Sequence, residues 1–455
     1  MTTAPTTCLD HIASGNVGLV ELLKSPFEPT LGTGNGSCSL SNAVDQLQNT
    51  LSSIDLSFDL SSNDYIGQWL NERGVSGKYK IELPDLRTMI TLVSGGSLSI
   101  TIGFVFSILL YYLVVPGKRL VLRKVFVGTL LLASSCAIPY MIFDALHVEN
   151  TAARFSICTP FVLYGFKILE AMFGFVPVGA QSSFITYCQY FVLPAEILFD
   201  NETSKPILAT TKDLLDSVRN VLLSALRIGL LVSYLSHYNY KPFGDTGAGQ
   251  FFDGVEVRKH LDLRHLGNCF FIALFFQQAL ALGDSVMGSS VQFITGYKVL
   301  KCMRNPMLEA ESPSDFWGRR WNLIVHRVMK RGVYKPVRKY ASPALASLLV
   351  FIASGLFHEW LVHAVVIYGR VSSSGEVYIG SNSAFFIWNF FVIMVERSVV
   401  GLDLVKSIGK SLPRPVLTLV IIMSSLPVAH WFGNPYLLGG FFLDYERCII
   451  MIRKA

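Results

Sequence analysis

The sequence predicts an all-α polytopic membrane protein, because its composition and the lengths of its apolar runs both point to this class. Of its 455 residues, 51% are hydrophobic and only 15% are charged, whereas soluble domains carry about 25% charged residues. Several separate apolar runs approach the roughly 20 residues that a helix needs to cross a bilayer. We expect about eight to nine transmembrane helices. The predicted spans are 93–115, 125–147, 158–178, 217–236, 266–286, 344–368, 384–401 and 413–433, with 437–451 as a ninth or partial span.

A polar N-terminal region precedes these spans. Residues 1–88 are rich in Ser, Thr, Asn and Asp, a composition typical of a partly disordered region. Residues 89–455 form the predicted transmembrane domain. Apolar residues at helical spacing indicate one amphipathic helix within the N-terminal region: Leu40, Val44, Leu47, Leu51 and Ile54.

Charge and cysteine patterns argue against two other classes. The net charge of +6 is modest, and the basic residues gather in loops, which fits the cytosolic side of a membrane protein better than a nucleic-acid surface. Eight cysteines are scattered from Cys8 to Cys448 without a CxxC pair, which argues against a zinc site or a disulfide framework. We therefore expect no metal and no nucleic-acid partner. The basic loop residues include Lys118, Arg119, Arg123, Lys124, Lys406, Lys410 and Arg414.

A basic and aromatic segment, residues 312–340, stands between two apolar runs. Ser312, Pro313 and Asp315 predict a helix start, and the helix that follows would lie in the membrane interface as an amphipathic helix. Pattern alone leaves two interpretations open: an anchor beside anionic lipid, or cations that also meet the phosphates of coenzyme A. The apolar side would carry Trp317, Trp321, Ile324, Val325 and Val328, and the cationic side Arg319, Arg320, Arg327, Lys330 and Arg331.

A histidine, His358, lies within the next apolar run, between Leu345 and Ile367. Ionisable groups at membrane depth usually face a bundle interior or a wet cavity, and an imidazole can act as a general base. The alternative is a hydrogen-bonded structural residue. Glu359 points about 100° away on a helix, so it is a candidate for the cavity wall rather than an automatic partner.

Other ionisable residues in the predicted spans are weaker candidates. Asp284 is expected to face a cavity, as Glu359 is. Lys167 and Glu170 are three residues apart, a spacing that favours pairing with each other on one helix face.

Two motifs together resemble the membrane-bound O-acyltransferase superfamily. DFWGRRWN at 315–322 looks like the signature of plant-type wax synthases. The longer run FWGRRWNLIVHRVMKRGVYKP, followed by SGLFHEWLV, is also similar to diacylglycerol and sterol O-acyltransferases, which carry a Trp-x-x-x-Trp-Asn element and a His-Glu pair in an apolar helix. The specific match covers about 50 residues, and the multi-span architecture extends over most of the remainder.

The resemblance implies catalytic roles and a site. His358 would be the catalytic base and Asn322 the second active-site residue, in a helical bundle around an internal catalytic tunnel that acyl-CoA enters from the cytosol and the acceptor from the bilayer. No cofactor is expected besides acyl-CoA as co-substrate. The predicted acyl-CoA-binding residues are Trp317, Arg319, Arg320, Trp321, His326, Lys330, Tyr334 and Lys335.

The predicted activity is transfer of a long-chain fatty acyl group to a lipid alcohol in the endoplasmic reticulum membrane, as in wax ester synthesis. The FYxDWWN motif of diacylglycerol acyltransferases is not recognisable just upstream, where the sequence reads LKCMRNPMLEAESPSDF. Triacylglycerol synthesis from diacylglycerol nevertheless stays open as an alternative activity. Formation of a homo-oligomer is also left open. An alternative of a different class is a non-catalytic transporter or lipid scaffold, which the absence of an internal repeat disfavours.

Overall fold

The computed structural model describes residues 40–60, 68, 71–72, 76–115, 121–200, 202–246, 257–369, 379–399 and 412–454. These divide into two compact units, Met1–Ile90 with Arg447–Ala455, and Thr91–Glu446. Most of the predicted N-terminal region and four of the basic loop residues, Lys118, Arg119, Lys406 and Lys410, lie outside the described residues.

The first unit combines one helix with a small sheet. The amphipathic pattern near residue 40 is present as helix α3 (Leu40–Ser53). Strands β1 (Ser57–Asp59), β2 (Lys78–Glu82) and β3 (Met451–Lys454) form an antiparallel sheet in the order β1-β2-β3. Glu82 pairs with Met451 in register, and its carboxylate accepts from the Arg453 guanidinium at 2.7 Å. The prediction of a partial span at 437–451 is wrong, because that stretch breaks into short helices and turns before β3.

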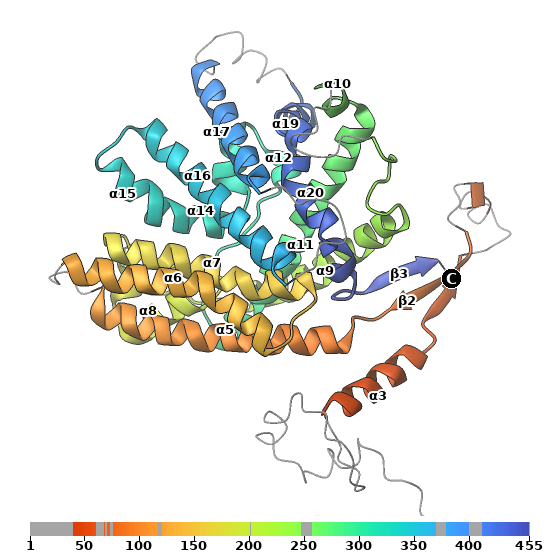
Figure 1. Cartoon of the computed structure of the whole chain (residues 1–455), viewed down its shortest axis with the longest axis horizontal. Helices are drawn as coiled ribbons and strands as arrows, with labels where there is room; N and C mark the ends of the chain where they lie inside the picture. The colour runs from red at the N-terminus through yellow and green to blue at the C-terminus, as the bar shows by residue number, and fades with distance from the viewer. Residues whose placement is uncertain are drawn as a thin grey trace, which may run out of the picture. The chain divides into compact units, whose positions relative to one another are not determined.

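The second unit is built from helices (Figure 1). Helix α5 (Leu86–Leu113) begins before Ile90 and continues past it. The helices that follow include α6 (Val121–Ala145), α7 (Thr151–Phe173), α8 (Phe184–Val192), α9 (Thr211–His237), α11 (Leu263–Thr295), α16 (Pro343–Val362), α17 (Ser381–Val399), α19 (Arg414–Met423), α20 (His430–Leu438) and α21 (Phe441–Glu446). Short helical elements are η1 (Gly179–Gln181), α10 (Val257–His260), α12 (Pro306–Glu309), α13 (Pro313–Asp315), η2 (Phe316–Arg320), α14 (Leu323–Met329), η3 (Lys330–Tyr334), α15 (Lys335–Arg338), η4 (His363–Ile367) and η5 (Leu426–Val428).

Six helices of the described residues are long and apolar enough to cross a membrane, or seven if one bent pair counts as a span. The expected count of eight to nine is therefore not confirmed. Helix α17 is not among the six, and the predicted span 413–433 is broken: Arg414–Val428 and His430–Leu438 meet at 55°. The six helices are α5, α6, α7, α9, α11 and α16 extended to Ile367.

Helix ends follow local chemistry. The Asn150 side chain accepts from the Ala153 amide at the start of α7, and Thr210 forms a capping box with Asp213 at the start of α9. Such caps satisfy backbone amides that a helix cannot pair itself. Gly296 ends α11 with φ 71°, a left-handed conformation that favours glycine.

Helices α16 and α17 pack along each other (Figure 1), and two residues of α16 explain the close fit. Gly355 faces Ser383, where an added Cβ would lie only 2.7 Å from the Ser383 Cα. The Glu359 carboxylate accepts from the Ser383 amide at 2.8 Å, in the first turn of α17, where a negative charge is favourable. Glu359 therefore has a structural contact of its own at the helix interface.

A buried charged network ties α7 to η3. Lys167 does not pair with Glu170, contrary to prediction, because its ammonium donates to the carbonyls of Tyr190 and Phe191 at the end of α8. The Glu170 carboxylate instead accepts from Arg331 at 2.9 Å. The local spacing of two charges did not reveal that each has a better partner on another element.

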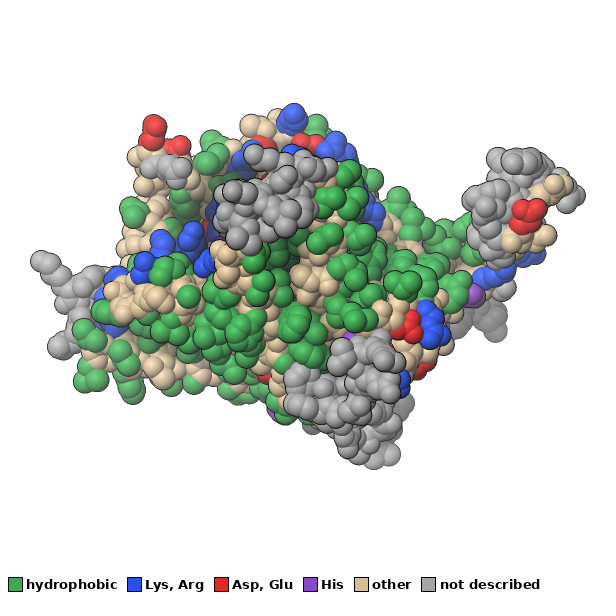
Figure 2. All heavy atoms as spheres, turned by 90° about the horizontal axis from the view of Figure 1, so that it is seen from above, with side chains coloured by type: hydrophobic (Ala, Val, Ile, Leu, Met, Phe, Trp, Pro, Cys, Tyr) green, Lys and Arg blue, Asp and Glu red, His purple; other side chains and the backbone are tan. Residues whose placement is uncertain are grey.

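Large apolar side chains cover much of the surface of the second unit. Leu122 is 79% exposed and Phe126 68% exposed on α6, and Leu226 is 57% exposed on α9. Figure 2 shows hydrophobic side chains across much of the visible face. Extended apolar surface of this kind is unusual on soluble proteins and is expected where helices face lipid.

Candidate active site

The basic and aromatic segment 312–340 is not one helix. It runs through α13, η2, α14, η3 and α15, and the expectation of a continuous amphipathic helix is wrong. The break lies at Trp321, which is extended with ψ 126°, and Asn322, which is left-handed with φ 40°. Asn tolerates this conformation better than most residues. The break turns both side chains toward a cavity instead of a helix surface.

The side chain of Asn322 is held by two contacts of its oxygen. Its Oδ1 accepts from the Val325 amide at 3.3 Å, so the residue is the N-cap of α14. The same oxygen accepts from the Cys302 thiol at 3.3 Å. Because Oδ1 is engaged twice, the Nδ2 amide is the part of the side chain that stays available for a ligand.

Asp284 supports Asn322 indirectly, through the backbone of Cys302. Its carboxylate accepts from the Cys302 amide at 3.0 Å, and the Cys302 carbonyl accepts from the Leu323 amide at 2.8 Å. The loop that carries Cys302 is thus joined to α11 on one side and to α14 on the other. Asp284 itself lines neither of the two cavities described below.

His358 lies in the C-terminal part of α16, in an aromatic cage. Its ring stacks on Phe386 with centroids 4.8 Å apart and meets the edge of Phe432 at 5.0 Å. Its Nδ1 is buried and has no hydrogen-bond partner among the described residues. Nε2 is therefore the nitrogen left to face the cavity.

Two cavities meet at His358 and Asn322. The first, here called the apolar cavity, has a volume of about 180 Å³, and no Lys, Arg, Asp or Glu occurs among the described residues that line it. The second, here called the cationic cavity, has a volume of about 350 Å³. A single continuous tunnel stays a prediction. The residues common to both cavities are Trp317, Trp321, Asn322, Val325, Phe357, His358 and Phe386.

The cationic cavity carries positive charge on its wall. Lys330 from η3 and Arg397 from α17 line it, together with His326 and Tyr334. Burial lowers the pKa of His326 below its ordinary value, and the charges of Lys330 and Arg327 lower it further. Lys330 and Arg397 are therefore the cations available to an anionic ligand in this cavity.

Three other predicted binding residues lie elsewhere. Arg320 pairs with Asp315 at 2.6 Å and with Glu309 at 2.9 Å, so its charge is already balanced. Arg319 and Lys335 are exposed and line neither cavity. Their predicted part in acyl-CoA binding stays a prediction that the cavity geometry does not support.

Three residues that sequence reasoning missed hold the site together. Arg397 lines the cationic cavity, and its neighbour Glu396 accepts from the Ser314 amide and hydroxyl, both at 2.7 Å. Asn389, fully buried, accepts from the Trp317 indole at 3.1 Å and from Ser425 at 2.6 Å. The available signal was a Glu-Arg pair and a lone Asn inside an apolar run, which usually mark functional or bridging positions.

The fold and the site define a class: a multi-pass helical membrane protein with one imidazole shared by an apolar and a cationic cavity. Residues 301–388, which contain both motifs, match the model of the membrane bound O-acyl transferase family. The predicted resemblance to this superfamily is confirmed, and the chain is wax synthase-like.

Curated relatives agree with this assignment. The chain is 30% identical over 182 residues to probable long-chain-alcohol O-fatty-acyltransferase 2 of Arabidopsis thaliana, which covers 37% of this chain and 48% of that relative. It is 34% identical over 125 residues to the long-chain-alcohol O-fatty-acyltransferase of Simmondsia chinensis, covering 24% and 34%. Acyl-CoA–sterol O-acyltransferase 1 of Arabidopsis thaliana is 29% identical over 195 residues, covering 40% and 49%. The matches span about half or less of these relatives' lengths.

Proposed function

We propose that this protein transfers a long-chain fatty acyl group from acyl-CoA to the hydroxyl of a long-chain alcohol, forming a wax ester. The observation that carries the proposal is the position of His358, whose imidazole lies where the apolar and cationic cavities meet. The names of the relatives support the reaction class and the alcohol.

In the proposed reaction, Nε2 of His358 accepts the hydroxyl proton as the alcohol oxygen attacks the thioester carbonyl. The new C–O bond forms a tetrahedral oxyanion, toward which the Asn322 amide donates a hydrogen bond. The C–S bond then breaks, and the coenzyme A thiolate takes the proton from the imidazolium. The thioester is already activated, so no acyl-enzyme is required, and the apolar walls limit competing hydrolysis.

The two cavities suit the two substrates. The cationic cavity offers Lys330 and Arg397 to the phosphates of coenzyme A. The apolar cavity is lined mainly by aromatic and aliphatic side chains, which suit hydrocarbon chains, and its described lining carries no charge that would demand a polar head group.

Diacylglycerol and sterols are the competing acceptors. Sterol is a competing acceptor because one relative is named as an acyl-CoA–sterol O-acyltransferase. With diacylglycerol as the acceptor, the product would be triacylglycerol. We place the reaction in the endoplasmic reticulum membrane, where lipid alcohols and acyl-CoA would meet it from the bilayer and the cytosol.

The test is an assay of microsomes that contain the protein, with labelled acyl-CoA and matched amounts of hexadecanol, diacylglycerol and sterol. Wax ester should be the main product, and microsomes with the His358→Ala variant at equal protein level are the control. If triacylglycerol or sterol ester is the main product, the proposed acceptor is wrong but the proposed acyl transfer stands. Equal ester formation by the wild type and the control would reject the proposed reaction.

A further inference from the structure

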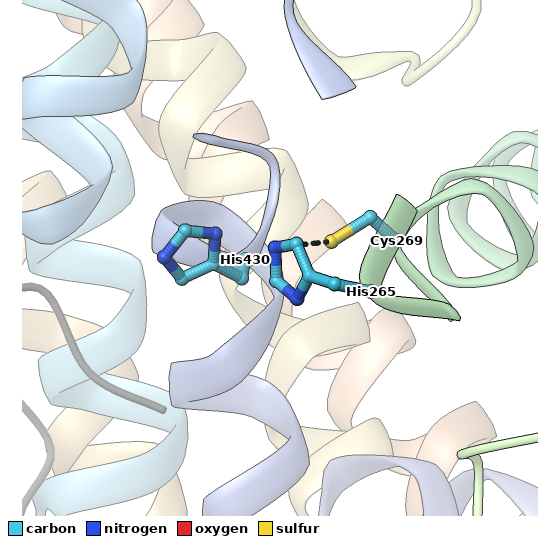
Figure 3. Close-up of side chains that lie close together, drawn as sticks. All are labelled: His265, Cys269 and His430. Carbon is cyan, nitrogen blue, oxygen red and sulfur yellow. Dashed lines mark hydrogen bonds between the residues drawn. The ribbon is translucent and has the colours of Figure 1, made fainter. Parts of the chain in front are cut away.

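A second group of reactive side chains lies apart from His358. His265 and Cys269 come from the first turns of α11, and His430 begins α20. Figure 3 shows the His265 ring between the Cys269 sulfur and the His430 ring. One ligand atom from each residue lies within 4.8 Å of the other two, and the His265 Nε2 is 3.5 Å from the Cys269 Sγ.

All three side chains are withdrawn from solvent. His265 is 3% exposed, Cys269 5% and His430 4%. Both ring nitrogens of His430 are buried and lack a hydrogen-bond partner among the described residues. Buried polar atoms are nearly always paired, so a buried imidazole without a hydrogen-bond partner, beside a thiol and a second imidazole, is suited to binding a metal ion.

The spacing fits a tetrahedral metal ion. His265 and Cys269 are four residues apart and therefore lie on one face of α11. In a tetrahedron with zinc bonds of about 2.0–2.3 Å, ligand atoms are about 3.3–3.8 Å apart. The sulfur-to-nitrogen separation of 3.5 Å already has this value, and the remaining separations are at most 4.8 Å.

A third histidine, His260, lies next to the group. The His260 ring on α10 lies 4.7 Å from the His430 ring and 5.9 Å from the His265 ring, between centroids.

We propose that His265, Cys269 and His430 bind a zinc-type transition-metal ion, with His260 as the fourth ligand. Imidazole and thiolate donors select zinc over magnesium or calcium, which prefer oxygen ligands. Metal binding at this site would hold whether or not the proposed acyltransferase reaction is correct. The sequence expectation of no zinc site relied on CxxC spacing, whereas these ligands come from three separate helices.

The metal would brace the wall of the His358 cavity. Cys269, Ile272 and Ala429 line both the apolar cavity and a third cavity of about 250 Å³, whose wall includes the three ligands. His430 is two residues before Phe432, whose ring meets the His358 ring. A metal that joins α20 to α11 would thus hold Phe432 in place.

Metal content of the detergent-purified full chain tests the proposal. The protein should carry an affinity tag without a histidine run, so that the tag contributes no metal. We expect about one equivalent of zinc in the wild type and its loss in Cys269→Ser and His430→Ala. Cys188→Ser and His237→Ala, which change residues outside the group, should keep it. A zinc-free wild type, or full zinc in both ligand variants, would overturn the proposal.

Cobalt gives a second readout that does not depend on the folding of any variant. Wild-type protein stripped with a chelator and reloaded with Co²⁺ should show a sulfur-to-cobalt charge-transfer band, because the thiolate is a ligand. Chelation should also lower the Tm of the wild type, since an ion bound only to the folded state stabilises it. Absence of the cobalt band would overturn the site as drawn, and so would a Tm that chelation leaves unchanged.

Discussion

The His358 ring stacks on the Phe386 ring at 4.8 Å between centroids, with 15° between their planes. Because Nδ1 has no hydrogen-bond partner among the described residues, packing alone sets the orientation of this imidazole. In many histidine bases a carboxylate or carbonyl at Nδ1 has this task. In this protein an aromatic ring from α17 takes its place.

The first prediction concerns this stacking. Phe386→Leu should lower kcat for ester formation roughly tenfold, which is about 1.4 kcal/mol and within the range of an aromatic pair. The KM values should change less, because the imidazole is misoriented and not removed. Phe390→Leu, one turn further along α17 and likewise buried, is the matched control. Equal losses in the two variants would mean that general packing, not ring orientation, is affected.

The second prediction is that His358→Ala lowers ester synthesis to a small residual rate while membrane insertion and yield stay normal. The reason is that no other described residue common to both cavities can titrate as a base near neutral pH. Product formation per unit of protein, measured by radiolabel, is the readout. Turnover similar to that of the wild type would end the general-base assignment.

How far the fold follows from the sequence can be judged from α16 and α20. The run around His358 is uniformly apolar and begins at a Ser-Pro cap, so its span was predictable. The predicted span 413–433 has the same apolar character, yet its chain bends by 55° before His430. Hydropathy reports the solvent around a segment and does not report where neighbouring helices force a turn.

The third prediction assigns the cationic cavity to the acyl donor. Lys330→Gln and Arg397→Gln should each raise the KM for acyl-CoA about tenfold, near 1.4 kcal/mol for one contact to a charged group. The KM for the alcohol should change little. Added salt should mimic both variants, because it screens phosphate contacts. Lys339→Gln, at an exposed cation outside both cavities, is the control, and a uniform effect on all three would favour loss of a lipid anchor.

The site shows the same limit of sequence reasoning as the fold. His358 and Asn322 were predicted from motifs and do line the same cavities. The sequence pattern could not tell which of Arg331 and Arg397 is free to bind a ligand. Arg331 forms ion pairs with Glu170 at 2.9 Å and Glu196 at 3.0 Å. Arg397 lies on a helix far away in sequence. Whether a cation is free depends on long-range partners, which periodicity does not encode.

The fourth prediction concerns pH. Burial lowers the pKa of His326 in the folded protein, while the unfolded value is about 6.5. The unfolded chain therefore binds more protons in the window below about pH 6.5, and the free energy of unfolding must fall as pH falls through it. His326→Gln should remove part of the drop in Tm between about pH 7 and 5.5. His363→Gln at an exposed histidine is the control, and equal acid sensitivity of His326→Gln and the wild type would contradict this account.

The last prediction separates two tasks of Asn322. Its Oδ1 caps α14 and its backbone is left-handed, so Asn322→Ala would lose the cap and strain the backbone together. Asn322→Gly keeps the backbone conformation without strain, costs little at an N-cap and removes only the amide. If Nδ2 donates to the oxyanion, the glycine variant should have a normal Tm and a kcat lower by roughly 10²–10³. KM should change less.

A double variant decides whether the two residues share a site. Asn322→Gly combined with His358→Ala should be little worse than His358→Ala alone, because residues that act on one transition state are strongly non-additive. The readouts are single-turnover ester formation and Tm for the three variants and the wild type. If the glycine variant has the kcat of the wild type, Asn322 only caps α14 and takes no part in catalysis.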